Sequence, residues 1–279
     1  MSSDSNDDPL VDIRDLTVQF GRQEVLRNID LQIPRGQTLA VIGESGCGKT
    51  VLMKSIIGLI SPTSGEVLFD GHDLSKLGDK ELTRQRVRFG FVFQGAALFD
   101  SMSVGQNVAF PLREHSEYSP DEVREIVLAR LAEVGLPESI VAKKPAELSG
   151  GMRKRVGLAR ALAISPEIML YDEPTTGLDP IMSDVINELM LRVRERHPVT
   201  SVIVTHDMKT AQKVADRVVM LYPLQRVAEG ESQILYDGDP DAILSTRDQR
   251  VSQFVRGEAG ARLQEMREQN GNHHQPTTS

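Results

Sequence analysis

The stretch QTLAVIGESGCGKT, residues 37–50, decides the fold of this chain. Its first part, QTLAVIG, is a short apolar run bounded by glycine, which predicts a buried β-strand over 37–43. GESGCGKT, residues 43–50, has the spacing G-x-x-x-x-G-K-[ST], and a helix is predicted from about Lys49 to Leu59. A buried strand, a glycine-rich loop and a helix in this order predict an α/β fold with a phosphate-binding loop, the P-loop.

The glycines of this loop allow it to curl, so that successive backbone N–H groups point inward at phosphate oxygens. Lys49 would reach the β- and γ-phosphates of a nucleotide, and the Thr50 hydroxyl would take a place on Mg²⁺. Cys47 is expected to be a small buried residue rather than a redox switch. The residues expected to contact the nucleotide here are Gly43, Glu44, Ser45, Gly46, Cys47, Gly48, Lys49, Thr50 and Val51.

A pair of acidic residues follows a second buried strand. IMLYDEP, residues 168–174, has four apolar residues before Asp172 and Glu173. An acid at the carboxyl end of a parallel strand lies where ligands bind in open α/β sheets. Asp172 would hold the Mg²⁺ shell, through water, and Glu173 would orient or deprotonate the attacking water. Without the P-loop, this pair would be interpreted as a solvated turn.

Two further polar residues end strands in the same way. His206 follows TSVIVT, residues 200–205, and Gln94 follows RFGFVF, residues 88–93. His206 could hydrogen-bond the γ-phosphate and hold the water, whereas a lone histidine is usually a surface or core residue. The Gln94 amide could contact Mg²⁺ and the water. The convergence of four strand ends on one edge of the sheet favours the catalytic interpretation.

A serine and two glycines open a predicted helix in AELSGGMRKR, residues 146–155. Glycine is a poor helix former, so bare N–H groups must be needed at this helix start. Ser149, Gly150 and Gly151 are therefore expected to face an anion, which the positive end of the helix dipole favours. The basic residues that follow, at 153–155, are expected to form a solvated helix face.

Bulk composition limits the classes of function. The chain has 279 residues, of which 39% are hydrophobic and 26% charged, as in an ordinary globular protein. Its net charge of −8 and its lack of tryptophan argue against a nucleic-acid partner. A single cysteine suits a reducing compartment, and neither a signal peptide nor an apolar run of about 18 residues is evident. We expect a cytoplasmic chain that could sit on a membrane through a partner.

Strands that alternate with helices predict a parallel sheet with right-handed crossovers. A helical block over about 100–160 interrupts this alternation and is expected to be a subdomain. Residues 1–9 are expected to be disordered, and the chain beyond 247 to be helical to about 268 and disordered after Asn270. Other strands are predicted at 11–20, up to Ile33, at 65–71 and at 217–222, and other helices at 119–136, 181–196 and 208–216.

In order along the chain, these motifs resemble the motif set of the ABC ATPases over about residues 11–245. The set comprises GESGCGKT, Gln94 after FVF, LSGGM, LYDEP, TGLD at 176–179, and His206 after VIVT. The resemblance implies a P-loop NTPase with a RecA-like parallel sheet core, an N-terminal antiparallel β subdomain and an inserted α-helical subdomain. It implies one ATPase domain over 10–247, followed by a C-terminal extension over 248–279.

The resemblance also implies a shared active site. In ABC ATPases two domains face each other head to tail, so residues 149–151 would bind the γ-phosphate of ATP held by the other copy, and Asp179 would lie at the same interface. Phe20 matches the aromatic position that stacks on adenine, with plain strand packing as the alternative. Glu173 would be the general base of ATP hydrolysis, while Mg²⁺, Lys49 and His206 stabilise charge.

A longer phrase, FQGAALFDSMSVGQNVAFPLREH at 93–115, together with Met152, resembles the lipid-transport branch, which includes the Mce-associated ATPases. This implies a phospholipid or another hydrophobic substrate, an integral-membrane permease and an MCE-domain protein, with the chain on the inner face of the cell membrane. The segment after Gln94 would receive the permease's coupling helix. The alternatives are an importer ATPase for a polar solute and a non-transport ABC ATPase.

One stretch departs from the family pattern. YPLQRVAEGESQ, residues 222–233, precedes ILYDGDP, residues 234–240, where the family has a tight turn before its return strand. We expect a surface insertion here.

Overall fold

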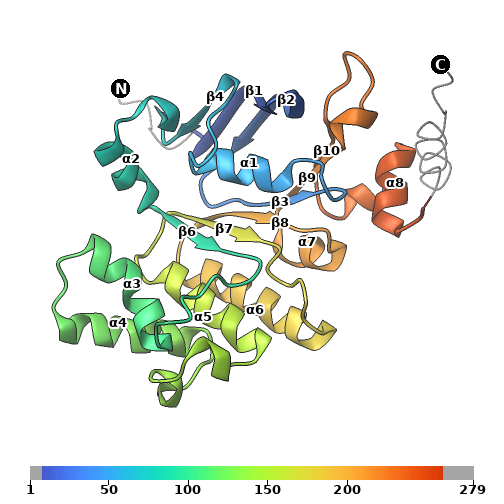
Figure 1. The fold of residues 1–279 in the computed structure, drawn as a ribbon. Coiled ribbons are helices and arrows are strands. Elements are labelled where there is room, and N and C mark those ends of the chain that lie inside the picture. Colours follow the sequence, from blue (N-terminus) through green and yellow to red (C-terminus); the bar gives the residue numbers. More distant parts are fainter. Residues whose placement is uncertain (1–7, 260–279) are drawn as a thin grey trace, which may run out of the picture.

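The computed structural model describes residues 8–259 and is built around a six-stranded sheet with the strand order β10-β9-β3-β8-β7-β6 (Figure 1). All neighbours pair in parallel except β10, which returns antiparallel to β9. The predicted parallel core and return strand are confirmed. The strands are β3 (Thr38–Ile42), β6 (Phe89–Val92), β7 (Ile168–Asp172), β8 (Thr200–Val204), β9 (Arg217–Leu221) and β10 (Ile234–Gly238).

A second, four-stranded antiparallel sheet forms the predicted N-terminal β subdomain, with the order β2-β1-β4-β5. Its strands are β1 (Val11–Phe20), β2 (Gln23–Ile33), β4 (Ser64–Phe69) and β5 (His72–Asp73). Helix α1 (Lys49–Ile56) lies between the two sheets (Figure 1), and its Leu52, Met53 and Ile56 share one buried cluster with strands of both. The helix that follows the P-loop is thus fixed from two sides.

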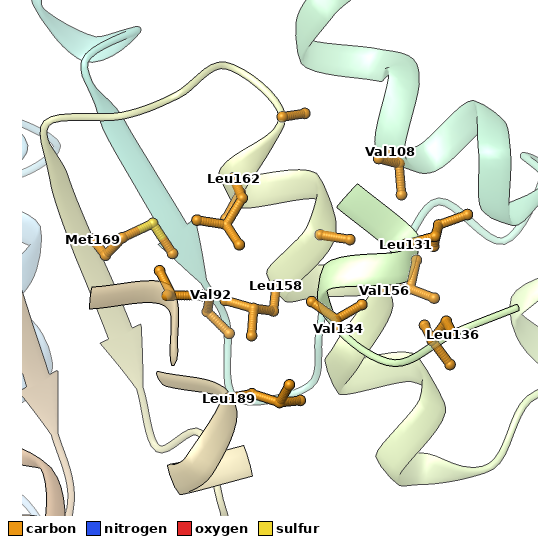
Figure 2. Packing of buried hydrophobic residues seen from close by; sticks show 14 of the residues in the cluster. Val92, Val108, Leu131, Val134, Leu136, Val156, Leu158, Leu162, Met169 and Leu189 are labelled. Carbon is orange, nitrogen blue, oxygen red and sulfur yellow. The ribbon is translucent and has the colours of Figure 1, made fainter. Parts of the chain in front are cut away.

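Helices cover the other face of the six-stranded sheet. They are α3 (Val104–His115), α4 (Pro120–Glu133), α5 (Gly150–Leu162), α6 (Pro180–Arg196) and α7 (Met208–Val214). Helix α5 joins the helical layer to the sheet, as Figure 2 shows: Val156 packs among Leu131 and Val134, whereas Leu162 lies toward Met169 of β7. One continuous core therefore includes both the helical block and this face of the sheet.

Short 3₁₀ turns complete the described chain, at Leu74–Lys76, Glu138–Ile140, Pro145–Glu147, Leu224–Arg226 and Ala242–Ser245. Within residues 8–259, no helix is both long enough and apolar enough to cross a bilayer. The predicted disorder before residue 8 and after Asn270 lies outside the described residues.

Three local features differ from the sequence prediction or were missed by it. Helix α2 (Asp79–Arg86) is highly polar and lacks the apolar periodicity that would have identified it. Helix α8 (Gln249–Arg256) ends at Gly257, whose φ of +67° breaks the helix, so the predicted helix is interrupted there, and its predicted continuation to about 268 lies outside the described residues. The stretch 222–233 is not merely a surface insertion, because Tyr222 and Gln233 at its ends are buried.

Gly43, at the end of β3, gives a first prediction. Its φ is +144°, and a Cβ placed there would lie 2.2 Å from the Leu221 carbonyl oxygen. Gly43→Ala is therefore expected to lower the free energy of unfolding by about 1–3 kcal/mol or more, measured by urea denaturation. Gly95→Ala is the control, because its φ is not in the positive range and no described atom lies within 4 Å of the added Cβ. Equal losses in the two variants would contradict the prediction.

Candidate active site

A cavity of about 450 Å³ lies at the carboxyl edge of the parallel strands. The P-loop and the residues that follow β6, β7 and β8 surround it, so the predicted convergence of four strand ends is present. Val25 of β2 also lines it and was not predicted, because its strand belongs to the other sheet. The lining consists of Val25, Ser45, Gly46, Gly48, Lys49, Thr50, Val51, Gln94, Asp172, Glu173 and His206.

The P-loop curls around its own lysine. The Lys49 ammonium donates hydrogen bonds to the carbonyl oxygens of Gly43 at 2.8 Å and Glu44 at 2.9 Å. Gly46 and Gly48 take positive φ angles of 81° and 102°, which favour glycine and turn the loop back on itself. This backbone shape suits a phosphate group. Cys47 is only 1% exposed, and burial raises the pKa of its thiol, as fits a small buried residue.

Oxygen donors suited to a magnesium ion meet beside Lys49. The Thr50 hydroxyl lies 3.4 Å from a carboxylate oxygen of Asp172, and Gln94 lines the same cavity. Burial, and then the neighbouring charge of Glu173, raise the pKa of Asp172 above its ordinary value. A bound cation would favour the ionised form of this carboxylate, and hydroxyl, amide and carboxylate oxygens are the ligands that Mg²⁺ prefers. The residues present therefore fit Mg²⁺.

Glu173 is held firmly beside the cavity. Its carboxylate oxygen lies 2.8 Å from Nδ1 of His206 and accepts a hydrogen bond from the Thr176 hydroxyl at 2.9 Å. Its φ of +48° is in the left-handed region, a conformation that costs about 1–3 kcal/mol in a non-glycine residue and occurs often at active sites. The backbone N–H of Glu173 donates to the Val204 carbonyl, which fixes this turn to β8.

Lys154 is a site residue that the sequence analysis missed. Its ammonium donates hydrogen bonds to the carbonyl oxygens of Gln94 at 3.0 Å and Glu173 at 3.2 Å, and the residue is 7% exposed. Burial lowers its pKa. The predicted solvated face is thus wrong at Lys154, and Arg155 also turns inward, donating to the Gly135 carbonyl. Nothing local in the sequence marks Lys154, because its two acceptors lie 60 and 19 residues away.

Other predicted site residues lie outside the cavity lining within residues 8–259. Ser149 caps α5 by accepting a hydrogen bond from the Met152 N–H. Gly150, the first residue of this helix, is exposed. Asp179 caps α6 by accepting from two backbone N–H groups. Phe20 is 51% exposed, which argues against the strand-packing alternative. One chain therefore brings the P-loop and strand ends together and leaves these residues on its surface.

The fold and the geometry of the cavity define a P-loop nucleoside triphosphatase. Residues 26–176 match the family model described as ABC transporter. The chain belongs to the ABC transporter family, as a nucleotide-binding subunit with ATPase activity.

Known relatives agree with this assignment. The chain is 41% identical over 250 residues to the intermembrane phospholipid transport system ATP-binding protein MlaF of Haemophilus influenzae, covering 90% of this chain and 91% of that protein. It is 41% identical over 233 residues to the probable ribonucleotide transport ATP-binding protein mkl of Mycobacterium tuberculosis, covering 84% of this chain and 65% of that protein. The dimeric ATP-binding cassette MJ0796, solved in a post-hydrolysis state with ADP and Pi, has a TM-score of 0.72 and 33% identity, covering 82% and 98% of the two chains.

The second prediction concerns Lys154→Ala. The variant removes the ammonium group that ties the carbonyl groups of Gln94 and Glu173 together, so the backbone at these two site residues is less firmly placed and ATP turnover should fall about tenfold or more. ATP affinity should change much less, because the P-loop is untouched. Phosphate release and equilibrium ATP binding measure the two effects.

Arg192→Ala, at an exposed position on α6, is the control. Wild-type turnover in Lys154→Ala, or a loss of turnover that only follows loss of ATP binding, would contradict the positioning role.

Proposed function

We propose that this chain energises an ABC transporter that moves phospholipid or another hydrophobic molecule, from a peripheral position on the inner face of the cell membrane. The observation that carries the proposal is the similarity to MlaF over nine-tenths of both chains, whereas the match to mkl leaves about a third of mkl uncovered. The ATPase domain would span about 10–247, with a C-terminal extension over 248–279. A permease and an MCE-domain protein would be its partners.

An apolar groove of about 430 Å³ supports a membrane partner. It lies where β6 meets α3 and α5, in the segment after Gln94 that was expected to receive a coupling helix. Phe93 and Phe99 remain 39% and 41% exposed there, which suits an amphipathic helix from a permease. The groove is lined by Phe89, Gly90, Phe91, Phe93, Ala97, Phe99, Phe110, Pro111, Arg160, Ala161 and Ile164.

Polar contacts beneath the groove hold its aromatic residues in place. The fully buried Asn107 side chain accepts a hydrogen bond from the Phe99 N–H at 2.8 Å and donates one to the Phe99 carbonyl at 3.1 Å. The Arg160 guanidinium donates to the Ala96 and Ala97 carbonyls, both at 2.8 Å. A groove shaped in advance loses less conformational entropy when a partner docks.

ATP hydrolysis would use the cavity residues in distinct roles. The P-loop backbone and Lys49 would bind the phosphates, and Glu173 would take a proton from the attacking water while His206 holds the γ-phosphate and the water. Mg²⁺, held by Thr50, Gln94 and, through water, Asp172, would neutralise charge on the phosphates when bound.

A second copy of the chain would complete each site. The exposed helix start at Ser149 and Gly150 offers N–H groups to the γ-phosphate of ATP held by the other copy, with Gly151 behind them. Asp179 would lie at the same interface, and the exposed Phe20 would stack on adenine. The MJ0796 cassette, a relative, is dimeric in its structure with ADP and Pi, which supports an assembly of two copies.

Substitution of Glu173 by Gln gives the third prediction. The amide cannot accept the proton of water, so turnover should fall by about 10²–10⁴-fold while ATP binding persists. The variant should accumulate as an ATP-bound dimer, measured by phosphate release and by sedimentation with and without ATP. Glu195→Gln, at an exposed position on α6, should behave as wild type. Turnover that survives in Glu173→Gln would overturn the assignment of the base.

The groove gives the fourth prediction. Phe99→Asp should weaken binding to the permease by roughly tenfold or more, because it places a charge in the apolar lining of the groove. ATPase activity of the isolated chain should be retained. Tyr118→Asp, with a similarly exposed aromatic residue outside the groove lining, is the control. Co-purification from solubilised membranes measures both.

The same preparation tests the substrate. The wild-type complex should carry bound phospholipid, and phospholipid should stimulate its ATPase. Stimulation by a ribonucleotide and not by lipid would instead support the polar-solute alternative that the name of mkl suggests.

A further inference from the structure

The connection between β9 and β10 reaches back to the P-loop. Figure 1 shows it in orange, rising from the sheet on the side where β2 and α8 lie. It begins at Tyr222, which is 4% exposed, and ends at Gln233, which is 2% exposed. The catalytic scheme above uses neither residue. Two buried polar side chains at the ends of one segment require a structural reason.

Gln233 bonds to three separate parts of the chain. Its amide nitrogen lies within hydrogen-bond distance of the carbonyl oxygens of Val25 at 3.0 Å, Cys47 at 3.1 Å and Tyr222 at 3.2 Å. Its amide oxygen accepts from the Arg27 N–H at 3.1 Å. A single buried amide thus joins the P-loop at Cys47 to β2 and to the end of β9. These bonds fix the backbone of the P-loop at Cys47.

Arg226 holds the start of the same loop. Its guanidinium forms an ion pair with the Glu44 carboxylate at 2.6 Å, with side chains 20% and 28% exposed. It also lies over the Tyr222 ring, 4.8 Å from the ring centroid. Glu44 is the second residue of GESGCGKT, and its side chain lies outside the cavity lining described above. The ion pair therefore contacts the P-loop outside the nucleotide cavity and does not contact the phosphates directly.

Helix α8 joins this network through Arg250. That guanidinium contacts the Glu231 carboxylate at 2.6 Å and Asp248 at 2.7 Å, and it lies 5.4 Å from the centroid of the Tyr222 ring. A hollow of about 440 Å³, with walls that include Ser45, His206 and Arg250, lies between α8 and the P-loop. Contacts thus run without interruption from α8 through residues 222–233 to Glu44 and Cys47.

We propose that residues 222–233 form a brace that sets the shape of the P-loop and makes ATP affinity depend on the position of helix α8. Arg226 and Gln233 are its positioning residues. The proposal rests on the proposed ATP site, and it gives a role to the one stretch that departs from the family pattern.

The test measures equilibrium binding of a non-hydrolysed ATP analogue to the full chain. Arg226→Ala should weaken binding about three- to tenfold, since one charge-assisted bond that shapes the loop is lost. Arg217→Ala is the matched control: it removes an ion pair with Asp237 in the same hairpin, of similar exposure, that contacts no P-loop residue. Arg250→Ala should weaken binding by a smaller factor, whereas Arg256→Ala, at an exposed position on the same helix, should not.

A double-mutant cycle separates positioning from a general loss of stability. Because Arg226 is proposed to act through Glu44, Glu44→Ala and Arg226→Ala should be non-additive in ATP affinity, with the double variant no weaker than the weaker single one. Gln233→Leu should weaken ATP binding and Gln233→Glu should not restore it, because the carboxylate cannot donate to the Cys47 carbonyl. Wild-type affinity in both Arg226→Ala and Arg250→Ala would overturn the proposal.

Failure of the ATP site itself would look different. If wild type does not bind the analogue, or if Lys49→Ala binds it equally well, the proposed function fails. If wild type binds and Lys49→Ala does not, while Arg226→Ala and Arg217→Ala lose affinity equally, only the brace is refuted.

Discussion

The curl of the P-loop is the constraint on which the rest of this structure depends. A loop that presents several N–H groups to one anion needs backbone with positive φ angles, which Gly43, Gly46 and Gly48 supply. It also needs a donor for its carbonyl groups, and the Lys49 ammonium donates to those of Gly43 and Glu44. Such a loop is costly to order alone. It is held by β3 and α1 at its ends, by the second sheet through α1, and by the buried Gln233 at Cys47. Several elements of the fold thus fix the backbone conformation of the P-loop, residues 43–50.

The site also carries an electrostatic cost. Burial raises the pKa of Asp172, so the free energy of unfolding falls as pH rises through the range where an ordinary carboxyl ionises. Burial lowers the pKa of Lys154, so its contribution to the free energy of unfolding increases as pH rises through the range where an ordinary ammonium group loses its proton. Glu173 adds backbone in a left-handed conformation. None of these features stabilises the fold by itself. A bound nucleotide and cation would offset the cost of burying these charges. Without them, contacts with neighbouring residues hold Asp172, Lys154 and Glu173 in place.

The parts of the site that the sequence predicts are those where chemistry and local pattern coincide. A few neighbouring residues are enough to identify the P-loop, the acid pair at the end of β7, and Gln94 and His206 after their strands. The order of the strands in the sheet then brings these residues to one cavity. The contacts of Lys154, Arg226 and Gln233 could not. The acceptors of Lys154 lie 60 and 19 residues away, Glu44 lies 182 residues from Arg226, and Cys47 lies 186 residues from Gln233. No local period marks a buried polar side chain. Helix α2 was missed because a polar surface helix has no apolar stripe, and Gly257 ended α8 earlier than its polar composition indicated.

Helix α5 gives a physical reason why nucleotide and membrane partner should affect each other. Its cap, Ser149, lies at the helix start that ATP held by a second copy would contact. Lys154, about 8 Å further along the helix, donates hydrogen bonds to the Gln94 and Glu173 carbonyls of its own site. Arg160, about 9 Å beyond Lys154, donates to the Ala96 and Ala97 carbonyls beside the groove. Val156 and Leu158 fix the helix in the core between these points. Because a buried helix moves as a rigid element, a partner that shifts the groove also shifts the carbonyls of Gln94 and Glu173. Transport and hydrolysis would then be coupled through one helix, without a separate relay.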